Sequence, residues 1–477
     1  MSLSKINFLI LVLAILMVVL ISHRAVIIDE GVYLYAGKLV SEGKIPYLDF
    51  AHVQGPLFPV FYGLLNIVFG QDIYINRIVT TLFGLSGLIF GGLIAKKLGG
   101  KTAESIYFLF CITSIYILIH YIVVSTYAVT AFLLYSAVFF AVCKNKTILS
   151  YLVILFVSAI RLSVLVIIPI LAAYLIIESE NKKKIVWLLF TITVIFYSII
   201  FLPFILKSSD VFLYNILGGH LGSISMKQRI ITILDTFLAN LKDYTVLAIS
   251  FLISCIYFLK RKNKHLSKIV FILLSFSVLF ITHLFPISNR GSYYNVLNIP
   301  FLFIVLGYVF ANVFGRKKYI AVGLIVVLLL NFAEQVVLVN EHHLLQKENP
   351  IKKIDEVAGY IADNTKKSET ILTFSTLLAV QSRRFIPDEF TEDCFSHKVG
   401  WSTDKCKRYK RVNNEIFADY ISDPKIKLIA IEDFDMHRFG LQKKDILEKM
   451  EKKGFVFTKK FEDFGQWHDN LYIFVRQ

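Results

Sequence analysis

The chain has 477 residues, of which 56% are hydrophobic and only 18% charged, with 42 Phe, 24 Tyr and a mean hydropathy of +0.64. A soluble enzyme of this length carries about a quarter charged residues and hides its apolar residues in one or two cores, so the composition excludes that class. Disordered, collagen-like and disulfide-framework proteins are excluded by the same numbers. The composition indicates a membrane protein.

The net charge of +16 is unevenly distributed along the chain. Residues 1–338 contain 27 Lys and Arg against 12 Asp and Glu, whereas residues 339–477 contain 24 against 23. The basic surplus therefore belongs to the apolar part, where membrane topology and anionic lipid headgroups explain it. No nucleic-acid partner is expected.

Apolar runs predict roughly eleven membrane-spanning helices in residues 1–338. The first, 6–21, is followed by no small-residue cleavage site, so we interpret it as a retained span. The other runs are 73–95, 105–124, 127–142, 148–160, 162–177, 185–206, 244–259, 269–285, 296–314 and 319–339. The stretch 56–70 is apolar but too short to cross, and we expect a helix lying at the outer surface.

The basic loops orient these helices, because cytoplasmic loops are enriched in Lys and Arg. With Lys5 inside, every basic cluster falls on the cytoplasmic side and most acidic loop residues fall outside. The basic clusters are Lys96 to Lys101, Lys144 and Lys146, Lys182 to Lys184, Lys260 to Lys268, and Arg316 to Lys318. We therefore expect a multi-pass plasma-membrane protein whose first loop, 23–72, and C-terminal part lie on the extracytoplasmic side.

The composition changes to charged, alternating segments after residue 338. We predict a small α/β domain over 339–477, with helices at 351–364 and 443–453 and strands at 370–374, 427–431, 455–460 and 471–475. Cys394 and Cys406 lie in this domain, and either a disulfide or two free thiols is compatible with an extracytoplasmic location.

The first outer loop contains the residues most suited to chemistry. Asp29 and Glu30 follow the first helix at the membrane edge, where partial desolvation raises the pKa of a carboxyl group toward general-base values. Solvent-exposed loop acids are the alternative interpretation. No His, Cys or acidic spacing typical of a metal site is present, so a divalent metal is not expected.

Several segments resemble polyprenyl-phosphate-sugar-dependent glycosyltransferases of the GT-C class, which includes protein O-mannosyltransferases and lipid A aminoarabinose transferases. Residues 29–50, DEGVYLYAGKLVSEGKIPYLDF, and 55–59, GPLFP, are similar to the first loop of that class. The resemblance continues in order through nearly the whole chain, at Gly70, Arg77, LFGLSGLIFGGLIAKKLGGKTA (82–103), AIRLS (159–163), RGSYY (290–294) and NIP (298–300).

The resemblance implies a GT-C-like transmembrane domain over 1–338 and transfer of a hexose or pentose to an acceptor hydroxyl, with inversion. The donor would be a polyprenyl-phosphate sugar, with no certain cofactor, and the acceptor a protein, glycolipid or polysaccharide of the cell envelope. Asp29 matches the family's acid and would withdraw the acceptor proton, with Glu30 beside it. The phosphate leaves without a protonating acid but needs cations. The candidate substrate-binding residues are His52, Arg161, Arg290, Tyr293 and Tyr294, with Lys44 a weaker one.

One departure from the family leaves alternatives open. Many members carry a second acid at the outer end of a later helix pair, where this chain reads Ser125-Thr126-Tyr127. Either Asp29 works alone, or Glu30 takes part of the role, or the chain is a catalytically inactive member. A transporter or flippase for a lipid-linked saccharide is a further alternative, because many apolar spans with scattered basic residues fit it too.

Overall fold

The computed structural model describes residues 3–218, 226–239, 251–252, 254–255, 265–284, 292–314, 349–438, 443–467 and 469–477. The chain divides into two compact units. Unit 1 comprises Met1–Ile21, Val79–Pro203 and Leu217–Val339, and unit 2 comprises Ser22–Ile78, Phe204–Ile216 and Asn340–Gln477. The first outer loop thus belongs to the same unit as the C-terminal segment. Whether 339–477 folds as an independent domain stays a prediction.

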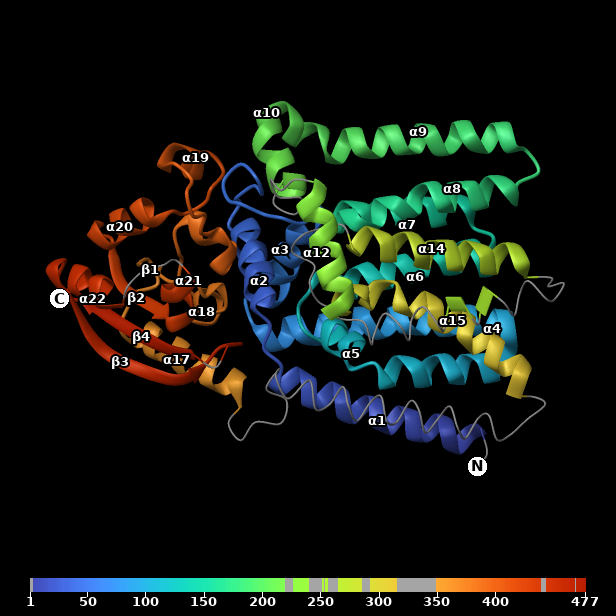
Figure 1. Cartoon of the computed structure of the whole chain (residues 1–477), viewed down its shortest axis with the longest axis horizontal. Helices are drawn as coiled ribbons and strands as arrows, with labels where there is room; N and C mark the ends of the chain where they lie inside the picture. Colours follow the sequence, from blue (N-terminus) through green and yellow to red (C-terminus); the bar gives the residue numbers. More distant parts are fainter. Residues whose placement is uncertain are drawn as a thin grey trace. The chain divides into compact units, whose positions relative to one another are not determined.

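Helices make up the described part of unit 1 (Figure 1). They are α1 (Leu3–Arg24), α4 (Ile73–Thr113), α5 (Ile115–Ile122), α6 (Thr126–Lys144), α7 (Thr147–Ile160), α8 (Ile167–Ile177) after the short helix η1 (Leu162–Val166), α9 (Lys182–Ile200), α12 (Met226–Ala239), α14 (Leu266–Leu284) and, after η3 (Ser292–Leu297), α15 (Ile299–Phe314). Within the described residues, α4, α6, α9 and α14 are long and apolar enough to cross a membrane. The membrane protein expected from composition is therefore supported.

Most of the predicted apolar runs are helical where the structure describes them. Gly100, with φ 78° and ψ −172°, breaks α4 between the runs predicted at 73–95 and 105–124. Glycine accommodates this positive φ without steric cost. The run at 185–206 is also divided, because α9 ends at Ile200 and α10 (Leu202–Leu213) begins with Pro203 in its first turn. The run at 319–339 and nearly all of that at 244–259 lie outside the described residues.

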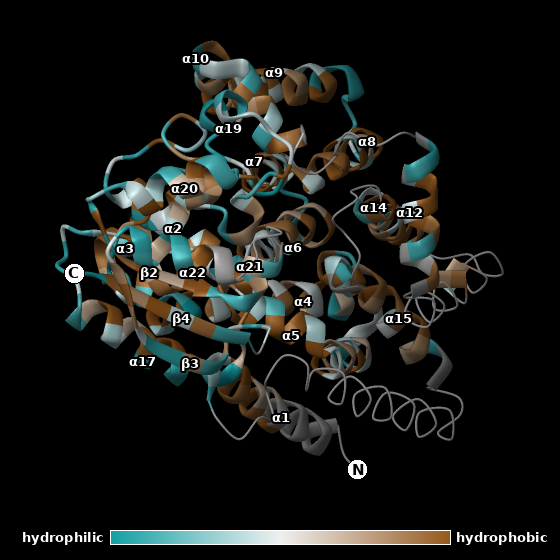
Figure 2. Cartoon of the chain, turned by 60° about the vertical axis from the view of Figure 1, so that its left-hand side comes forward, coloured by the Kyte–Doolittle hydropathy of each residue, from teal (hydrophilic) through white to brown (hydrophobic). Residues whose placement is uncertain are grey.

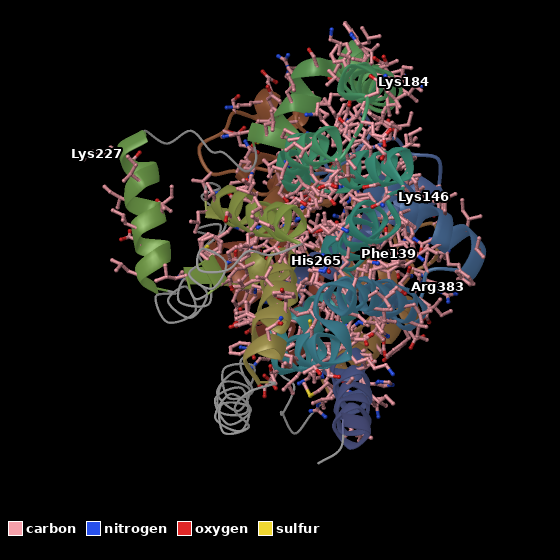
Figure 3. All side chains as sticks on the ribbon, turned by 90° about the vertical axis from the view of Figure 1, so that its right-hand side faces the viewer. Phe139, Lys146, Lys184, Lys227, His265 and Arg383 are labelled. Atoms are coloured by element: carbon pink, nitrogen blue, oxygen red, sulfur yellow. The ribbon has the colours of Figure 1, made fainter. Side chains whose placement is uncertain are left out.

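Three of the basic turns meet at one end of the unit 1 helices. Cys143, at the end of α6, interacts electrostatically with the positive charges of Lys97, Lys144 and Lys268. The Lys268 ammonium group also donates a hydrogen bond of 2.8 Å to the carbonyl of Val142. Figure 3 views the unit 1 helices nearly end-on, with Lys146 labelled. This grouping agrees with the basic clusters lying on one side; which side faces the cytoplasm stays a prediction.

A four-stranded sheet forms the centre of the C-terminal part of unit 2. The strands β1 (Thr370–Leu372), β2 (Ile426–Glu432), β3 (Phe455–Phe464) and β4 (Asp469–Arg476) lie in the order β1-β2-β4-β3. The β1 and β2 strands are parallel, and β4 runs antiparallel to both its neighbours, with Ile429 opposite Phe474. Figure 2 shows β4 as hydrophobic and β3 as largely hydrophilic, in keeping with a central and an edge strand.

The helices of unit 2 pack around this sheet and the first loop. They are α2 (Ile28–Ser41), α3 (Leu57–Phe69), α10, α17 (Pro350–Asp363), α18 (Thr376–Gln381), α19 (Thr403–Arg408), α20 (Asn414–Ser422), α21 (Asp433–Arg438) and α22 (Lys443–Lys452), with the short helices η5 (Asp388–Phe390) and η6 (Asp393–Ser396). The predicted small α/β arrangement is confirmed, including α17, which Asn349 caps by accepting a hydrogen bond of 3.0 Å from the backbone N–H of Ile351.

The α3 helix is too short to cross a bilayer. Thirteen residues rise about 20 Å, against about 30 Å of hydrocarbon. One of its faces is apolar and exposed, with Leu64, Ile67 and Val68 between 59% and 70% accessible. A lipid-facing surface helix would bury such a face.

Candidate active site

Asp29 lies in the first turn of α2. The helix begins after Ile27, which has an extended backbone, and the backbone N–H of Ile28 donates a hydrogen bond of 2.9 Å to the side-chain oxygen of Gln466. Asp29 and Glu30 are therefore at the positive end of the helix dipole, where acidic side chains stabilise a helix. Asp29 is half-buried, whereas Glu30 is fully buried.

Glu30 is bound by Arg77 of α4. The Arg77 Nε–H donates to Glu30 Oε1 at 2.8 Å, and its Nη2 contacts Glu30 Oε2. The same guanidinium donates to the carbonyls of Ser22 and Ala25. Both partners are buried, so the pair ties the chain before α2 to the start of α4. Both oxygens of Glu30 are engaged, and its charge is compensated.

Gly31 brings α2 against the C-terminal part of unit 2. A Cβ atom at this position would lie 2.5 Å from the backbone nitrogen of Leu377 and 2.7 Å from the Thr376 hydroxyl. Only glycine allows this approach of α2 to α18. Asp29, two residues earlier, is thereby held beside residues that follow β1.

His52 and Glu392 form a buried pair in unit 2. His52 Nδ1 is 3.7 Å from Glu392 Oε1, with side-chain exposures of 0% and 2%. The rings of Phe58 and Tyr47 lie 6.5 and 6.2 Å from the His52 ring, centroid to centroid. Burial lowers the pKa of His52 to about 3, with a smaller contribution from the positive charge of Arg411. His52 is therefore neutral, and its burial separates it from solvent.

Two acidic side chains of η6 and its preceding residue are electrostatically coupled to Asp29. Burial raises the pKa of Glu392 to about 7, with Arg411 opposing and the charge of Asp29 adding to the shift. Burial likewise raises the pKa of Asp393 to about 6, although hydrogen bonds from Cys394 and Thr376 oppose it. The charge of Asp29 raises this pKa too. Asp29 thus has two carboxyl neighbours that are far from it in sequence.

A pocket lies at the start of α2 within unit 2. Its wall includes Ile27, Asp393, Glu432, Phe434 and Trp467. Phe434 and Trp467 stack with their centroids 5.1 Å apart, and Trp467 is 48% exposed. Burial raises the pKa of Glu432 well above its usual range, and the neighbouring acids add to the shift. The pocket therefore combines an accessible aromatic surface with carboxyl groups.

Arg161 is the centre of a polar cluster in unit 1. Its Nη2 donates to the Tyr127 hydroxyl at 3.1 Å, its Nη1 contacts the Thr126 hydroxyl, and the guanidinium lies 4.1 Å from the Tyr127 ring centroid. Arg161 is 8% exposed, and its Nε has no hydrogen-bond partner among the described residues. His283 bonds Ser163 at 3.3 Å beside this cluster.

This cluster accounts for the hydroxyls of Thr126 and Tyr127, in the segment where the family resemblance suggested an acid, whereas the Ser125 hydroxyl donates to the carbonyl of His120. The Thr126 and Tyr127 hydroxyls hold the guanidinium without cancelling its charge, as a carboxylate would. Arg161 thus keeps its positive charge available to an anion.

The structure brings Asp29, Glu30 and His52 together in unit 2 and has Arg161 in unit 1. Arg290 lies outside the described residues, only the backbone of Tyr293 is described, and Tyr294 is half-buried in η3. Lys44 forms an ion pair of 2.5 Å with Asp388. Cys394 and Cys406 are free thiols. Among the residues described, no group of three His, Cys, Asp or Glu side chains is arranged to hold a metal ion.

Sequence reasoning did not identify Glu392, Asp393 or Arg411 as site residues. They lie more than 300 positions from Asp29, and no motif or spacing connects them to it. Only the pairing of the first loop with the C-terminal segment reveals them. A weak signal was available in the adjacent acids Glu392 and Asp393, the same pattern that drew attention to Asp29 and Glu30.

No family model matches the chain, and no curated protein matches it in sequence. Solved structures do match: the fold is that of the GT-C membrane glycosyltransferases, and the resemblance expected from the sequence is confirmed at this level. ArnT from Cupriavidus metallidurans in the apo state is similar with a TM-score of 0.64 and 12% identity, over 98% of each chain. ArnT bound to undecaprenyl phosphate gives a TM-score of 0.62 and 12% identity, over 99% of this chain and 98% of that chain. The Archaeoglobus fulgidus oligosaccharyltransferase, in complex with Zn and sulfate, gives 0.52 and 14%, over 96% of this chain and 72% of that one.

Proposed function

We propose that this protein is an integral membrane glycosyltransferase that moves a sugar from a polyprenyl-phosphate carrier to an acceptor hydroxyl, with Asp29 as general base. The observation that carries the proposal is an acid in the first turn of α2, coupled to two further carboxyl groups, in a chain similar to ArnT over 98% of its length. ArnT has been observed with undecaprenyl phosphate bound, which supports a lipid-phosphate donor here.

In the proposed step, an acceptor hydroxyl transfers its proton to the Asp29 carboxylate while its oxygen attacks the anomeric carbon of the sugar. The bond from that carbon to the carrier phosphate breaks, and the phosphate departs with the electron pair. Attack opposite the leaving group inverts the anomeric centre. The phosphate needs no protonating acid, so one carboxylate is sufficient for the base chemistry.

The other candidate residues have complementary roles in this proposal. Glu30, held by Arg77, fixes the start of α2 and so positions Asp29. Arg161, whose Nε–H is unused among the described residues, binds the carrier phosphate together with Arg290. His52 is enclosed by unit 2 and supports the first loop without touching the donor.

The pocket at the start of α2 is our candidate for the acceptor-binding region. Trp467 and Phe434 offer a flat apolar surface, and the carboxyl groups offer hydrogen-bond acceptors for hydroxyls. In this proposal the C-terminal segment selects the acceptor, which is a protein, glycolipid or polysaccharide. We further propose about eleven membrane-spanning helices, with this site on the extracytoplasmic side of the plasma membrane.

The proposal is tested by incubating purified protein in detergent with a panel of radiolabelled polyprenyl-phosphate sugars and total envelope material. Wild-type protein should transfer label, and Asp29→Asn should transfer it about a hundredfold to ten-thousandfold more slowly, because general-base catalysis contributes about 10²–10⁴. Asp49→Asn is the matched control, since the Asp49 side chain accepts a hydrogen bond of 2.7 Å from the backbone N–H of Ile45 within the loop.

Full transfer by a folded Asp29→Asn variant would contradict the role of Asp29. Movement of labelled lipid across proteoliposomes with no release of its sugar would instead support a flippase. Absence of transfer with every donor and acceptor would favour an inactive family member.

A further inference from the structure

Glu392 is carried into the surroundings of the first loop by a hydrogen-bonded segment. The Thr391 hydroxyl donates to the carbonyl of Ala51 at 3.2 Å, and the backbone N–H of Glu392 donates to the Ser396 hydroxyl at 3.0 Å. The side chain is 2% exposed. The surrounding residues of unit 2 therefore hold the Glu392 side chain in place, away from solvent.

The polar atoms around Glu392 are incompletely satisfied. Glu392 Oε1, both ring nitrogens of His52 and the Arg411 Nε have no hydrogen-bond partner within the described part of the chain. A different nitrogen of Arg411, Nη2, donates a hydrogen bond of 2.9 Å to the side-chain oxygen of Asn215. A buried polar atom without a partner destabilises the fold, so a group of such atoms indicates a place where charge or protonation has a role.

The charged groups that act on Glu392 come from α2 and from the C-terminal segment, and Glu392 also accepts a hydrogen bond from the backbone N–H of Val53. Asp29 of α2 opposes its ionisation, whereas Arg411 and Lys398 of the C-terminal segment favour it. His52 of the first loop is neutral, and Glu392 in turn acts on the buried Tyr47 hydroxyl. Electrostatic coupling is reciprocal, so a charge on Glu392 would also disfavour ionisation of Asp29.

We propose that Glu392 is a positioning residue, the second carboxyl group of the site, which stays protonated while Asp29 is ionised. The inference rests on the proposed function and extends it to a residue 363 positions away from Asp29. A neutral Glu392 leaves Asp29 as the base and adds no negative charge near the anionic carrier. No bond to substrate is formed, and the proton remains on the Glu392 carboxyl oxygen throughout the transfer.

The proposal has a consequence for the pH dependence of transfer. Burial raises the pKa of Glu392 to about 7, so the group ionises as the pH passes through neutral. Two neighbouring carboxylates then repel each other and the donor phosphate, and kcat/KM should fall. The fall should approach about tenfold per pH unit if only the protonated form supports transfer.

The first experiment compares the pH profiles of kcat/KM for wild type, Glu392→Gln and Glu392→Asp, using the full chain. Glutamine cannot ionise, so Glu392→Gln should keep its rate from pH 6.5 to above pH 8, whereas wild type and Glu392→Asp decline. Glu389→Gln is the matched control in the same segment, because Glu389 accepts a hydrogen bond of 2.7 Å from Tyr420 and should decline like wild type.

A second measurement does not depend on activity or on the right donor. Infrared difference spectra of the purified protein should show the carbonyl stretch of a buried protonated carboxyl group at pH 6, and its loss above about pH 7.5. The band should be absent in Glu392→Gln and should disappear at lower pH in Asp29→Asn, because the repelling charge has been removed.

The inference is overturned if wild type has no such band, if Asp29→Asn leaves its titration unchanged, or if Glu392→Gln declines in parallel with wild type. A folded Glu392→Gln variant that is inactive at all pH values would also overturn it, since the ionised group would then be needed. Failure of the proposed function gives a different result, in which Asp29→Asn transfers sugar as wild type does.

Discussion

Arg77 binds both carboxylate oxygens of Glu30 and, with its remaining N–H groups, the backbone carbonyls of Ser22 and Ala25. This one guanidinium therefore connects the residue next to Asp29, the segment that precedes α2 and the start of α4. Because both side chains are buried, the structure of the first loop depends on Arg77 and Glu30 both being present.

Replacing Arg77 with Met should destabilise the protein by about 3–5 kcal/mol, because it leaves the buried Glu30 carboxylate uncompensated. Thermal unfolding in detergent measures the change. The control is Glu104→Ala, which removes the exposed pair with Lys96 at 3.1 Å and should change stability by less than about 1 kcal/mol. Equal effects of the two substitutions would show that the Arg77 pair is not structural.

Gly31→Ala should destabilise unit 2 and reduce transfer, because the new methyl group would meet the backbone of Leu377 at 2.5 Å. We expect a loss of about 1–3 kcal/mol from the forced shift of α2 or α18. Gly359→Ala is the matched control, since Gly359 lies in the helix α17 with nothing within 4 Å of an added Cβ. It should be neutral or stabilising by up to about 1 kcal/mol. Parallel melting curves for the two variants would contradict the close approach.

His52→Phe should remove a destabilisation that the wild type suffers at acid pH. The pKa of His52 is about 3 in the folded protein, against 6.5 for an ordinary histidine, so below pH 6.5 the unfolded chain binds the proton more readily. Stability of the wild type relative to His52→Phe should therefore fall as the pH falls from about 6.5 toward 3. Unfolding temperatures measured for both proteins at several pH values test this. A constant difference between them would show that His52 is not buried as a neutral ring.

Arg161→Lys should weaken binding of the donor more than binding of the acceptor. Lysine lacks the planar fork that bonds Thr126 and Tyr127 together, so the charge would be less well fixed. We expect the donor KM to rise about tenfold or more, in line with the ~1.5–3 kcal/mol of a hydrogen bond to a charged group. Lys146→Arg, in the turn before α7, is the control and should leave KM unchanged. An unchanged donor KM in Arg161→Lys would remove Arg161 from the phosphate site.

Trp467→Ala should raise the acceptor KM while leaving the donor KM unchanged, because Trp467 contributes an exposed ring to the pocket at the start of α2. Initial rates with each substrate varied in turn separate the two constants. The exposed Trp187, on α9 of unit 1, provides the control substitution to Ala. A change confined to the donor KM would exclude this pocket as the acceptor site.

Hydropathy and charge were sufficient to predict the membrane class and most helices, because apolar length and basic turns are local properties of the sequence. The turn at Gly100 and the helix α17 fall where composition changes. The strands β2 and β4 were likewise predicted from their short apolar runs.

The surroundings of Asp29 could not be predicted in the same way. Glu392 reaches the first loop beside Thr391, whose hydroxyl donates to the carbonyl of Ala51, and the nearby contact of α2 with α18 depends on the missing side chain of Gly31. Hydrophobic periodicity indicates which face of a helix or strand is apolar. It does not indicate which distant helix or strand packs against that face. The family resemblance suggested a second acid at 125–127, whereas the carboxyl groups that are charge-coupled to Asp29 come from the C-terminal segment.

The strand order β1-β2-β4-β3 also limits when the sheet can form during synthesis of the chain. The β4 strand lies between β2 and β3 and pairs with both. The four-stranded sheet therefore cannot form completely until Asp469–Arg476 has left the ribosome. Asp29 is made long before β1 and β4, yet its carboxyl neighbours follow β1 and reach their final positions with the sheet. A ribosome-bound chain that stops before residue 469 should therefore have all its apolar segments available for insertion while its candidate base still lacks a finished environment.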